Sequence, residues 1–458
     1  MIKSSYNALV NAIIRPPRCE YDISKLGPPA FAFCGRRFVR RDFVLTNARG
    51  LKICCSMWEP QAAERPAALL PCVIYMHGNS SARLEALSSL SLVLSLGATL
   101  LAFDFAGSGM SEGEYVSLGY FEKDDLGCVI EHLRQGTTST IALWGRSMGA
   151  STALLHGERD PSIASMVLDS AFHSLVMLAE EMVEMGRQQG LFAPGILVRM
   201  VLSFVRSSVQ KAANFDIRLL RPIDSVDKCF VPALFVAALN DHFVSQKHSE
   251  LLHAAYGGDK NLVIVDGDHN SPRPRFLYDS IGIFLATTLQ IPDSWMLADC
   301  EQYIRRMPWA APPASFQSQR RRFYPYAYFP ELRTYFNSCT FLSSANTLIH
   351  SYTHTLIHSY THTLIHSYTH PNSFGLSGTF AGPARGVAEN NGNGGGGGSG
   401  GSGGNGGGDA EMEAMLRMHM CEGAGAEGAA EMSLDDLMAI SVLVSTHGVK
   451  GGVKLHRD

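Results

Sequence analysis

The stretch that decides the fold is Gly145-Arg146-Ser147-Met148-Gly149, which reads G-x-S-x-G. It follows the apolar run STIALW and precedes the small-residue helical run ASTALLHG. A serine between two glycines, on a sharp turn from a buried strand into a helix, exposes its hydroxyl as a nucleophile. The glycines are needed because a larger side chain would clash in so tight a turn. The pattern predicts a nucleophilic Ser147, but so short a pattern recurs by chance, and the surrounding sequence has to support it.

Short apolar runs alternate with helical segments from about residue 38 to about residue 290. An antiparallel hairpin is expected around Arg49-Gly50. Further strands are expected in PCVIYMHGN, ATLLAFDF, STIALWG, IASMVLDSA, VPALFVAAL and NLVIVDGD. Repeated strand–helix alternation predicts parallel pairing, right-handed crossovers and helices on both faces, which gives a mostly parallel sheet of about eight strands.

Residues 172–230 form a segment too long for a simple connection between two elements. They contain two helical candidates rich in Met, Leu and Val, HSLVMLAEEMVEMGRQQG and PGILVRMVLSFVRSSVQKAA. These apolar residues belong either to the core or to a lid above the site, where methionine adapts to an apolar substrate. The two interpretations are compatible, because an inserted segment can pack and cover at once. The segment is therefore expected to be a helical lid insertion.

A serine hydroxyl needs a histidine to take its proton and an acid to orient that histidine. With this kind of turn, the chain order is serine, acid, histidine. His269 follows the last expected strand, in VDGDHNSP, and Asp241 follows the preceding strand, in AALNDHF. Both emerge at the edge of the sheet where Ser147 lies, because parallel strands end together there. The sequence predicts a catalytic triad of Ser147, Asp241 and His269.

Other histidines are weaker candidates for the base, because none follows the final strand. They are His77, His173, His242 and His248. Three further aspartates compete with Asp241 for the acid: Asp169, Asp266 and Asp268. Asp268 adjoins His269 and would have difficulty reaching its far ring nitrogen, whereas Asp169 follows the strand after the elbow and remains an alternative.

The tetrahedral intermediate also needs hydrogen-bond donors for its oxyanion. The backbone N–H of Met148, next to the nucleophile and at a helix start, is one expected donor. The other is the backbone N–H of Asn79 in the loop MHGNSS, where Gly78 permits a close approach. The sequence therefore predicts an oxyanion hole of two backbone amides.

Composition and motifs exclude several classes of protein. The formal net charge of -4 gives no general electrostatic case for a nucleic-acid partner. The ten cysteines form no C-x-x-C pair, which favours a reducing compartment over disulfides or zinc ligation. The glycine-rich DFAGSGMSEGE at 104–114 lacks the G-x-x-x-x-G-K-[ST] pattern and is expected to be a structural turn. No metal or cofactor is expected.

No targeting segment is expected either. The N-terminus lacks the apolar core and small-residue cleavage site of a signal peptide. Residues 86–103 form an uncharged stretch, but four serines and Gly97 favour a buried helix, turn and strand over a membrane span. The protein is expected in the cytoplasm.

The chain changes character after Pro292. Residues 1–37 are expected to be an N-terminal segment and 38–292 the main domain, followed by an irregular, low-complexity segment at 293–390. Within it TLIHSYTH occurs three times in tandem at 347–370, with a histidine at every fourth position. This spacing is compatible with metal binding, but three identical copies favour a translated simple DNA repeat. A flexible Gly-rich linker at 391–408 and a short helical tail at 409–458 complete a C-terminal extension that is expected to be disordered.

Several long strings resemble one group of α/β-hydrolases. They include YMHGNSSAR, DFAGSGMSEGEYVSLGYFEKDDL, LWGRSMGAS, DPSIASMVLDSAF, VQKAANFDI and GDKNLVIVDGDHNSPRP. The group comprises plant and protist serine aminopeptidase-like hydrolases, which are similar to animal depalmitoylating hydrolases. The resemblance covers about residues 8 to 290 and implies the α/β-hydrolase fold with the triad at Ser147, Asp241 and His269. The animal relatives carry a cysteine-rich, acylated N-terminus, whereas here only Cys19 is near the N-terminus. A single acyl chain binds a membrane only marginally, so stable lipid anchoring at Cys19 is not expected.

The expected activity is hydrolysis of an ester or thioester through an acyl-enzyme. The expected partner is an acyl-bearing small molecule or a lipidated protein, met in the cytoplasm or in peripheral contact with a membrane. Two alternatives stay open: a peptidase with the same triad, and a non-catalytic binding protein on a hydrolase fold. The sequence does not name the substrate.

Overall fold

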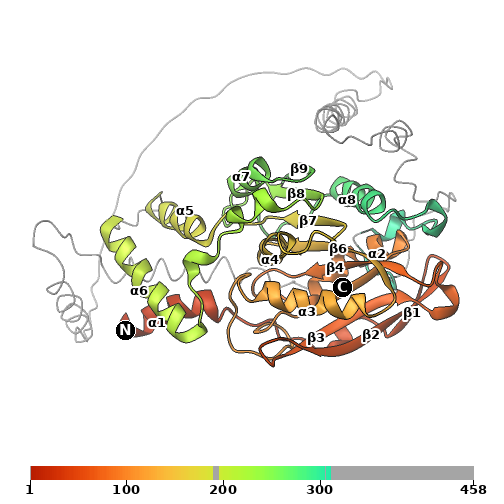
Figure 1. Cartoon of the computed structure of the whole chain (residues 1–458), viewed down its shortest axis with the longest axis horizontal. Helices are drawn as coiled ribbons and strands as arrows, with labels where there is room; N and C mark the ends of the chain where they lie inside the picture. Colours follow the sequence, from red (N-terminus) through yellow and green to blue (C-terminus); the bar gives the residue numbers. More distant parts are fainter. Residues whose placement is uncertain (1, 189–194, 305, 311–458) are drawn as a thin grey trace, which may run out of the picture. The chain divides into compact units, whose positions relative to one another are not determined.

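The computed structural model describes residues 2–188, 195–304 and 306–310, and its centre is a β-sheet (Figure 1). The strands are β1 (Ala30–Phe33), β2 (Arg36–Thr46), β3 (Lys52–Pro60), β4 (Leu70–Met76), β5 (Thr99–Phe103), β6 (Thr138–Arg146), β7 (Ser165–Asp169), β8 (Ala233–Ala238) and β9 (Lys260–Val265). Within the described residues they form one nine-stranded sheet in the order β1-β2-β3-β5-β4-β6-β7-β8-β9.

The sheet is antiparallel at one end and parallel over the rest. β1, β2 and β3 pair antiparallel, and β3 joins β5 antiparallel, whereas β5, β4, β6, β7, β8 and β9 pair parallel. The hairpin expected around Arg49-Gly50 joins β2 to β3. The predicted α/β-hydrolase fold with a mostly parallel sheet is confirmed. The ninth strand, β1, is a four-residue run that lies before residue 38, where the sequence predicted the domain to begin.

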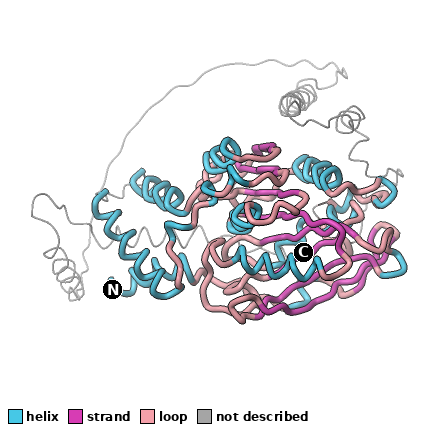
Figure 2. Tube along the Cα trace, viewed as in Figure 1, coloured by secondary structure: helices cyan, strands magenta, loops and turns pink. Residues whose placement is uncertain are grey.

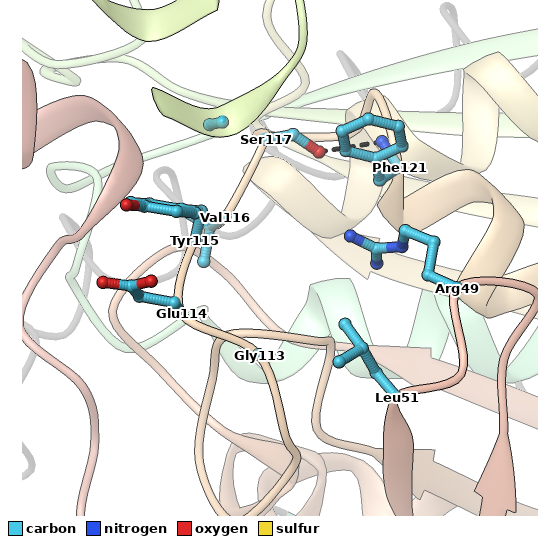
Figure 3. A pocket seen from close by; sticks show the side chains of 9 residues that line it. Arg49, Leu51, Gly113, Glu114, Tyr115, Val116, Ser117 and Phe121 are labelled. Carbon is cyan, nitrogen blue, oxygen red and sulfur yellow. Dashed lines mark hydrogen bonds between the residues drawn. The ribbon is translucent and has the colours of Figure 1, made fainter. Parts of the chain in front are cut away.

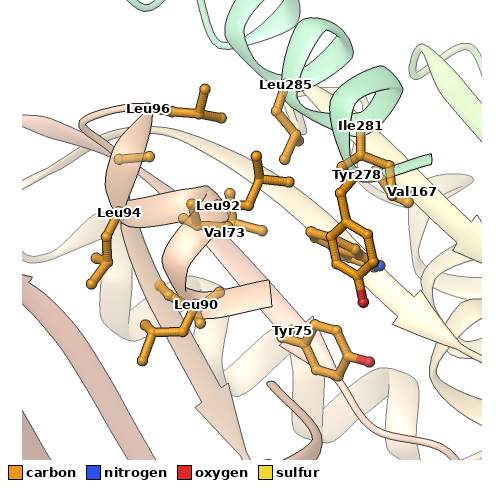
Figure 4. Packing of buried hydrophobic residues seen from close by; sticks show 14 of the residues in the cluster. Val73, Tyr75, Leu90, Leu92, Leu94, Leu96, Val167, Tyr278, Ile281 and Leu285 are labelled. Atoms are coloured by element: carbon orange, nitrogen blue, oxygen red, sulfur yellow. The ribbon is translucent and has the colours of Figure 1, made fainter. Parts of the chain in front are cut away.

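Helices cover both faces of this sheet (Figure 2). They are α1 (Ile2–Ile14), α2 (Leu87–Ser95), α3 (Glu122–Arg134), α4 (Met148–Gly157), α5 (Leu175–Gln188), α6 (Gly195–Ala213), α7 (Gln246–Ala255) and α8 (Arg275–Thr288). On one face, Val73 and Tyr75 of β4 pack in a cluster with leucines of α2 and α8 (Figure 4). On the other, Ile74 and Met76 pack with α3, α4 and α7. β4 is thus buried on both faces, as its uninterrupted apolar sequence predicts.

The N-terminal helix packs against the inserted segment. Val10 and Ile14 of α1 share an apolar cluster with Val205 and Val209 of α6. The Tyr6 hydroxyl lies 2.6 Å from the hydroxyl of Ser208. Helices α5 and α6 fall in the insertion predicted at 172–230, so α1 completes the packing of that insertion.

The chain after α8 continues along the α2 side of the sheet. The backbone N–H of Leu297 donates to the Ser95 carbonyl at 2.8 Å. Further on, the Trp309 ring meets the Phe31 ring edge to face with centroids 5.2 Å apart. Residues 293–304 and 306–310, predicted to be irregular, therefore pack on the hydrolase domain. The predicted repeat at 347–370, the linker at 391–408 and the tail at 409–458 lie outside the described residues.

The first turn of α4 packs against β4 without room for a side chain. A methyl group added at Gly149 would lie 2.2 Å from the Met76 carbonyl oxygen, whereas one added at Gly127 of α3 meets only a carbon of His156, at 3.7 Å. We expect Gly149→Ala to lower the free energy of unfolding by about 1–3 kcal/mol or more, because overpacking forces backbone shifts. Gly127→Ala is the matched control and should be neutral or stabilising by about 0.5–1 kcal/mol. Denaturant unfolding of both variants checks this, and equal stability of Gly149→Ala and the parent chain would contradict it.

Candidate active site

Ser147 lies at the sharp turn between the end of β6 and the start of α4. Its backbone has φ 52° and ψ -112°, a conformation that costs a residue other than glycine about 1–3 kcal/mol. A methyl group added at Gly145 would lie 2.3 Å from the backbone carbon of Gly149, which explains the first glycine of the motif. The Ser147 N–H donates to the Asp169 carbonyl at 2.7 Å and holds the turn against β7. The predicted strand–turn–helix is present, with strain at the predicted nucleophile.

Asp241 and His269 are in direct contact. His269 Nδ1 lies 2.6 Å from Oδ2 of Asp241, and both residues are buried. Oδ1 of Asp241 accepts the backbone N–H groups of Phe243 at 2.9 Å and of Val244 at 2.7 Å. Because Nδ1 donates to the carboxylate, Nε2 keeps its lone pair and can accept a proton. The structure brings together the acid and the base that the chain order predicts.

The competing acids have other partners. Asp169 binds the Arg273 guanidinium through Nη2 at 2.8 Å and Nε at 2.9 Å, and both side chains are buried. Burial would raise the pKa of Asp169, but the guanidinium of Arg273 outweighs it and the pKa lies below its usual range. Asp268 accepts from Asn270 N and Ser271 Oγ, and Asp266 is exposed. Of these aspartates, Asp241 is the one bonded to the His269 ring.

The Ser147 hydroxyl makes no hydrogen bond to another described residue, so its link to His269 is indirect in this structure. Arg146, the residue before Ser147, donates from Nη2 to the His269 carbonyl at 2.8 Å. Catalytic hydrogen bonds are often long without substrate and tighten in the complex. Through this contact of Arg146, the loop that carries His269 is tied to the elbow. The role of Ser147 as the nucleophile is a proposal.

The loop at 77–81 lies against the elbow. A methyl group added at Gly78 would lie 3.7 Å from Cβ of Ser147. Asn79 follows in that loop, and its side-chain Oδ1 is buried without a hydrogen-bond partner among the described residues. Met148 is the first residue of α4, so its N–H has no carbonyl of an earlier helical turn to bind. This placement fits the two predicted oxyanion donors.

Two of the histidines considered from the sequence have structural roles. Nε2 of His77 accepts the Phe105 N–H at 3.1 Å, so its Nδ1 carries the proton and donates to the Gly78 carbonyl at 2.8 Å. His248 is buried, with Nδ1 accepting the His173 N–H at 3.0 Å and Nε2 3.0 Å from Glu181 of α5. Burial lowers the pKa of His248 despite that carboxylate.

Helix α5 is anchored beside the loop that follows Asp241. Oε2 of Glu181 also accepts the hydroxyl of Ser245, the N-cap residue of α7, at 2.9 Å. Val244, next to Ser245, is one of the two amides that hold Asp241. The insertion is thus connected to the segment that holds the Asp241 carboxylate.

Sequence reasoning missed Arg146 and Glu85. Nη1 of Arg146 lies 3.3 Å from Oε1 of Glu85, and both side chains are largely buried. The available signal was a charged residue at the second position of the G-x-S-x-G motif, at the end of a buried strand. Its partner could not be found that way, because Glu85 lies 61 positions earlier.

A separate cavity of about 150 Å³ lies beside the segment 113–117 (Figure 3). Its lining includes Arg49, Tyr115 and Phe121, and none of the predicted site residues. The Arg49 guanidinium lies 4.8 Å from the centroid of the Phe121 ring and donates to Asp125 at 3.0 Å. The Arg49 side chain that lines this cavity is thus already paired with Asp125.

Two general features bear on the class of site. The described residues contain no cluster of three or more histidine, cysteine, aspartate or glutamate side chains arranged to hold a metal ion. In the same part of the chain, no helix has the length and apolar character needed to span a bilayer.

Residues 72–217 match the family model described as serine aminopeptidase, S33. The match includes the loop with Asn79 and the elbow with Ser147, and ends before Asp241 and His269. The chain is also 28% identical to the uncharacterised protein YqkD of Bacillus subtilis over 202 residues, which cover 43% of this chain and 64% of YqkD. An uncharacterised protein of Mycobacterium tuberculosis is 29% identical over 226 residues, covering 48% of this chain and 70% of that protein.

Solved structures similar to this chain include two esterases. An esterase of Pyrococcus furiosus is 20% identical, and the alignment covers 60% of this chain and 99% of the esterase chain with a TM-score of 0.44. An acetyl xylan esterase of Paenibacillus is 15% identical, and the alignment covers 62% of this chain and 92% of the esterase chain with a TM-score of 0.43.

The order of the sheet, the strained serine between β6 and α4 and the family match over residues 72–217 agree with one another. The part of the chain that the structure describes has the α/β-hydrolase fold, and residues 72–217 match the serine aminopeptidase model.

Proposed function

We propose that the protein is a serine hydrolase that cleaves an ester or thioester bond through an acyl-enzyme on Ser147. The observation that carries the proposal is the 2.6 Å contact between Asp241 and His269, in a loop tied to the strained elbow. A buried carboxylate on Nδ1 fixes the imidazole tautomer and stabilises the imidazolium that forms during catalysis.

In this mechanism Ser147 Oγ attacks the acyl carbonyl carbon while its proton passes to Nε2 of His269. The tetrahedral intermediate collapses as the bond to the leaving alcohol or thiol breaks, and His269 returns the proton to that group. A water molecule then attacks the acyl-enzyme with His269 again as base. The carboxylic acid leaves and Ser147 is restored.

The backbone amides of Met148 and Asn79 would bind the negatively charged oxygen of both tetrahedral intermediates. Support comes from the place of Met148 at the start of α4 and from the closeness of Gly78 to Ser147. In other serine hydrolases, loss of one such donor costs about 3–4 kcal/mol of transition-state stabilisation.

The apolar insertion supports an acyl substrate. Leu175 and Leu178 of α5 and Val205 and Val209 of α6 belong to a single apolar cluster, and α5 is anchored beside the Asp241 loop. Such a segment can cover the site and bind an acyl chain, and we propose an acylated small molecule or an S-acylated protein as the substrate. We further propose a cytoplasmic enzyme with peripheral membrane contact, and the dispersed cysteines without a C-x-x-C pair support a reducing compartment.

We expect a fluorophosphonate probe to label the parent chain and not Ser147→Ala. Asp241→Asn should lower kcat on a p-nitrophenyl acyl ester by about 10⁴-fold, because the imidazole then adopts the wrong tautomer. Asp268→Asn is the matched control beside the same histidine. It keeps the acceptor atom that binds Asn270 and Ser271, so its kcat should stay within a few-fold of the parent. Equal labelling of Ser147→Ala and the parent chain would sink the proposal.

The description of the matching family model favours a second candidate, a peptidase with the same three residues. We expect hydrolysis of p-nitrophenyl acyl esters to be faster than hydrolysis of aminoacyl-anilides by the purified protein. Faster anilide turnover would reverse the order of the two candidates. A non-catalytic binding protein is the remaining alternative, and turnover that His269→Ala abolishes would rule it out.

A further inference from the structure

Two loops flank Ser147, and one largely buried ion pair connects them. The first loop, 77–81, carries Asn79, and the second, 267–271, carries His269. The ion pair is Arg146–Glu85, with Nη1 of Arg146 3.3 Å from Oε1 of Glu85. Arg146 is the last residue of β6, so its backbone continues directly into the elbow.

The Arg146 guanidinium holds the loop with the base. Nη2 donates to the His269 carbonyl at 2.8 Å and to Oδ1 of Asn270 at 2.7 Å. Both terminal nitrogens of Arg146 thus already donate to acceptors of the protein. An arginine next to the nucleophile would suggest a binding site for an anionic substrate, but this pairing argues against that interpretation.

The Glu85 carboxylate holds the loop with the oxyanion donor. Oε2 accepts the Gly78 N–H at 3.1 Å, and Oε1 accepts the Tyr75 hydroxyl at 3.1 Å. Burial would raise the pKa of Glu85, but Arg146 and the hydrogen-bond donors around it keep the pKa below its usual value. Burial raises the pKa of Tyr75, so this phenol remains a donor. The carboxylate therefore stays ionised and connects β4 and the 77–81 loop to Arg146.

We propose that Arg146 and Glu85 are positioning residues that set the oxyanion loop and the base loop relative to each other around Ser147. This inference rests on the proposed function. Neither side chain touches a reacting atom; Arg146 acts through His269, and Glu85 acts through the N–H of Gly78, the residue before Asn79. Catalysis requires the nucleophile, the base and the oxyanion donors to converge on one carbonyl group, and a misplacement of about 1 Å can cost about 10²-fold in rate.

The test is steady-state hydrolysis of a p-nitrophenyl acyl ester by five variants, with rates normalised to the number of sites that a fluorophosphonate titrates. We expect Arg146→Met to lower kcat by about 10²-fold with little change in KM, because the reacting geometry is lost while binding of the acyl group is kept. Arg146→Lys, which cannot reach three acceptors at once, should recover only part of that loss. Glu85→Gln should lower kcat less than Arg146→Met, since an amide oxygen can still accept one hydrogen bond.

Combining Arg146→Met with Glu85→Gln should cost much less than the product of the two single effects, because both remove the same connection. Arg159→Met is the matched control, since Arg159 is an exposed arginine paired with Asp124, and its kcat should equal that of the parent chain. If Arg146→Met fails to fold, Arg146→Lys and Glu85→Gln decide the outcome by the same kcat-against-KM comparison.

If the parent chain hydrolyses the ester and Arg146→Met has the same kcat per titrated site, the positioning role is overturned and the proposed function stays intact. If Arg146→Met does not fold, an unchanged kcat in both Arg146→Lys and Glu85→Gln would likewise overturn the positioning role. A rise in KM at constant kcat would overturn it too, because Arg146 would then be binding substrate. A parent chain that neither turns over esters nor labels at Ser147 would overturn the proposed function, and this inference with it.

Discussion

The tight turn at Ser147 is the constraint on which the rest of the site depends. The serine holds a positive φ of 52° because β6 ends and α4 begins around it, with Gly145 against the Gly149 backbone. Gly149 in turn lies so close to the Met76 carbonyl that no methyl group fits between them. Strain of this kind persists only where the surrounding structure over-determines the backbone. The sheet therefore presents the serine hydroxyl rigidly instead of leaving it on a mobile loop.

Each proposed partner of the serine comes from the end of a different strand. Asn79 follows β4, Asp241 follows β8 and His269 follows β9, and all three strands are parallel to β6. The Asp241 carboxylate accepts from His269 and from two backbone amides, and these contacts orient the imidazole. Rigid strands bring these groups to one edge, and short contacts between loops set their relative positions.

Much of the fold and of the acid–base pair follows from local sequence. Parallel strands bring their carboxyl ends to one edge, so the order of Ser147, Asp241 and His269 along the chain was enough to predict a contact between the last two. The Arg146–Glu85 pair could not be predicted, because its members are far apart in the sequence and the position of Arg146 does not identify its partner. β1 and α1 were missed for another reason: a four-residue strand has too little pattern, and α1 is stabilised by packing on α6.

We propose that Ser147 attacks a carbonyl whose oxygen is bound by the amides of Met148 and Asn79. The most direct measurement is a crystal structure of the protein after reaction with a fluorophosphonate, whose phosphonyl group mimics the tetrahedral intermediate. We predict a bond from phosphorus to Ser147 Oγ and a phosphonyl oxygen about 2.7–3.1 Å from both amide nitrogens. Phosphorus on another residue, or a phosphonyl oxygen directed away from both amides, would contradict the account.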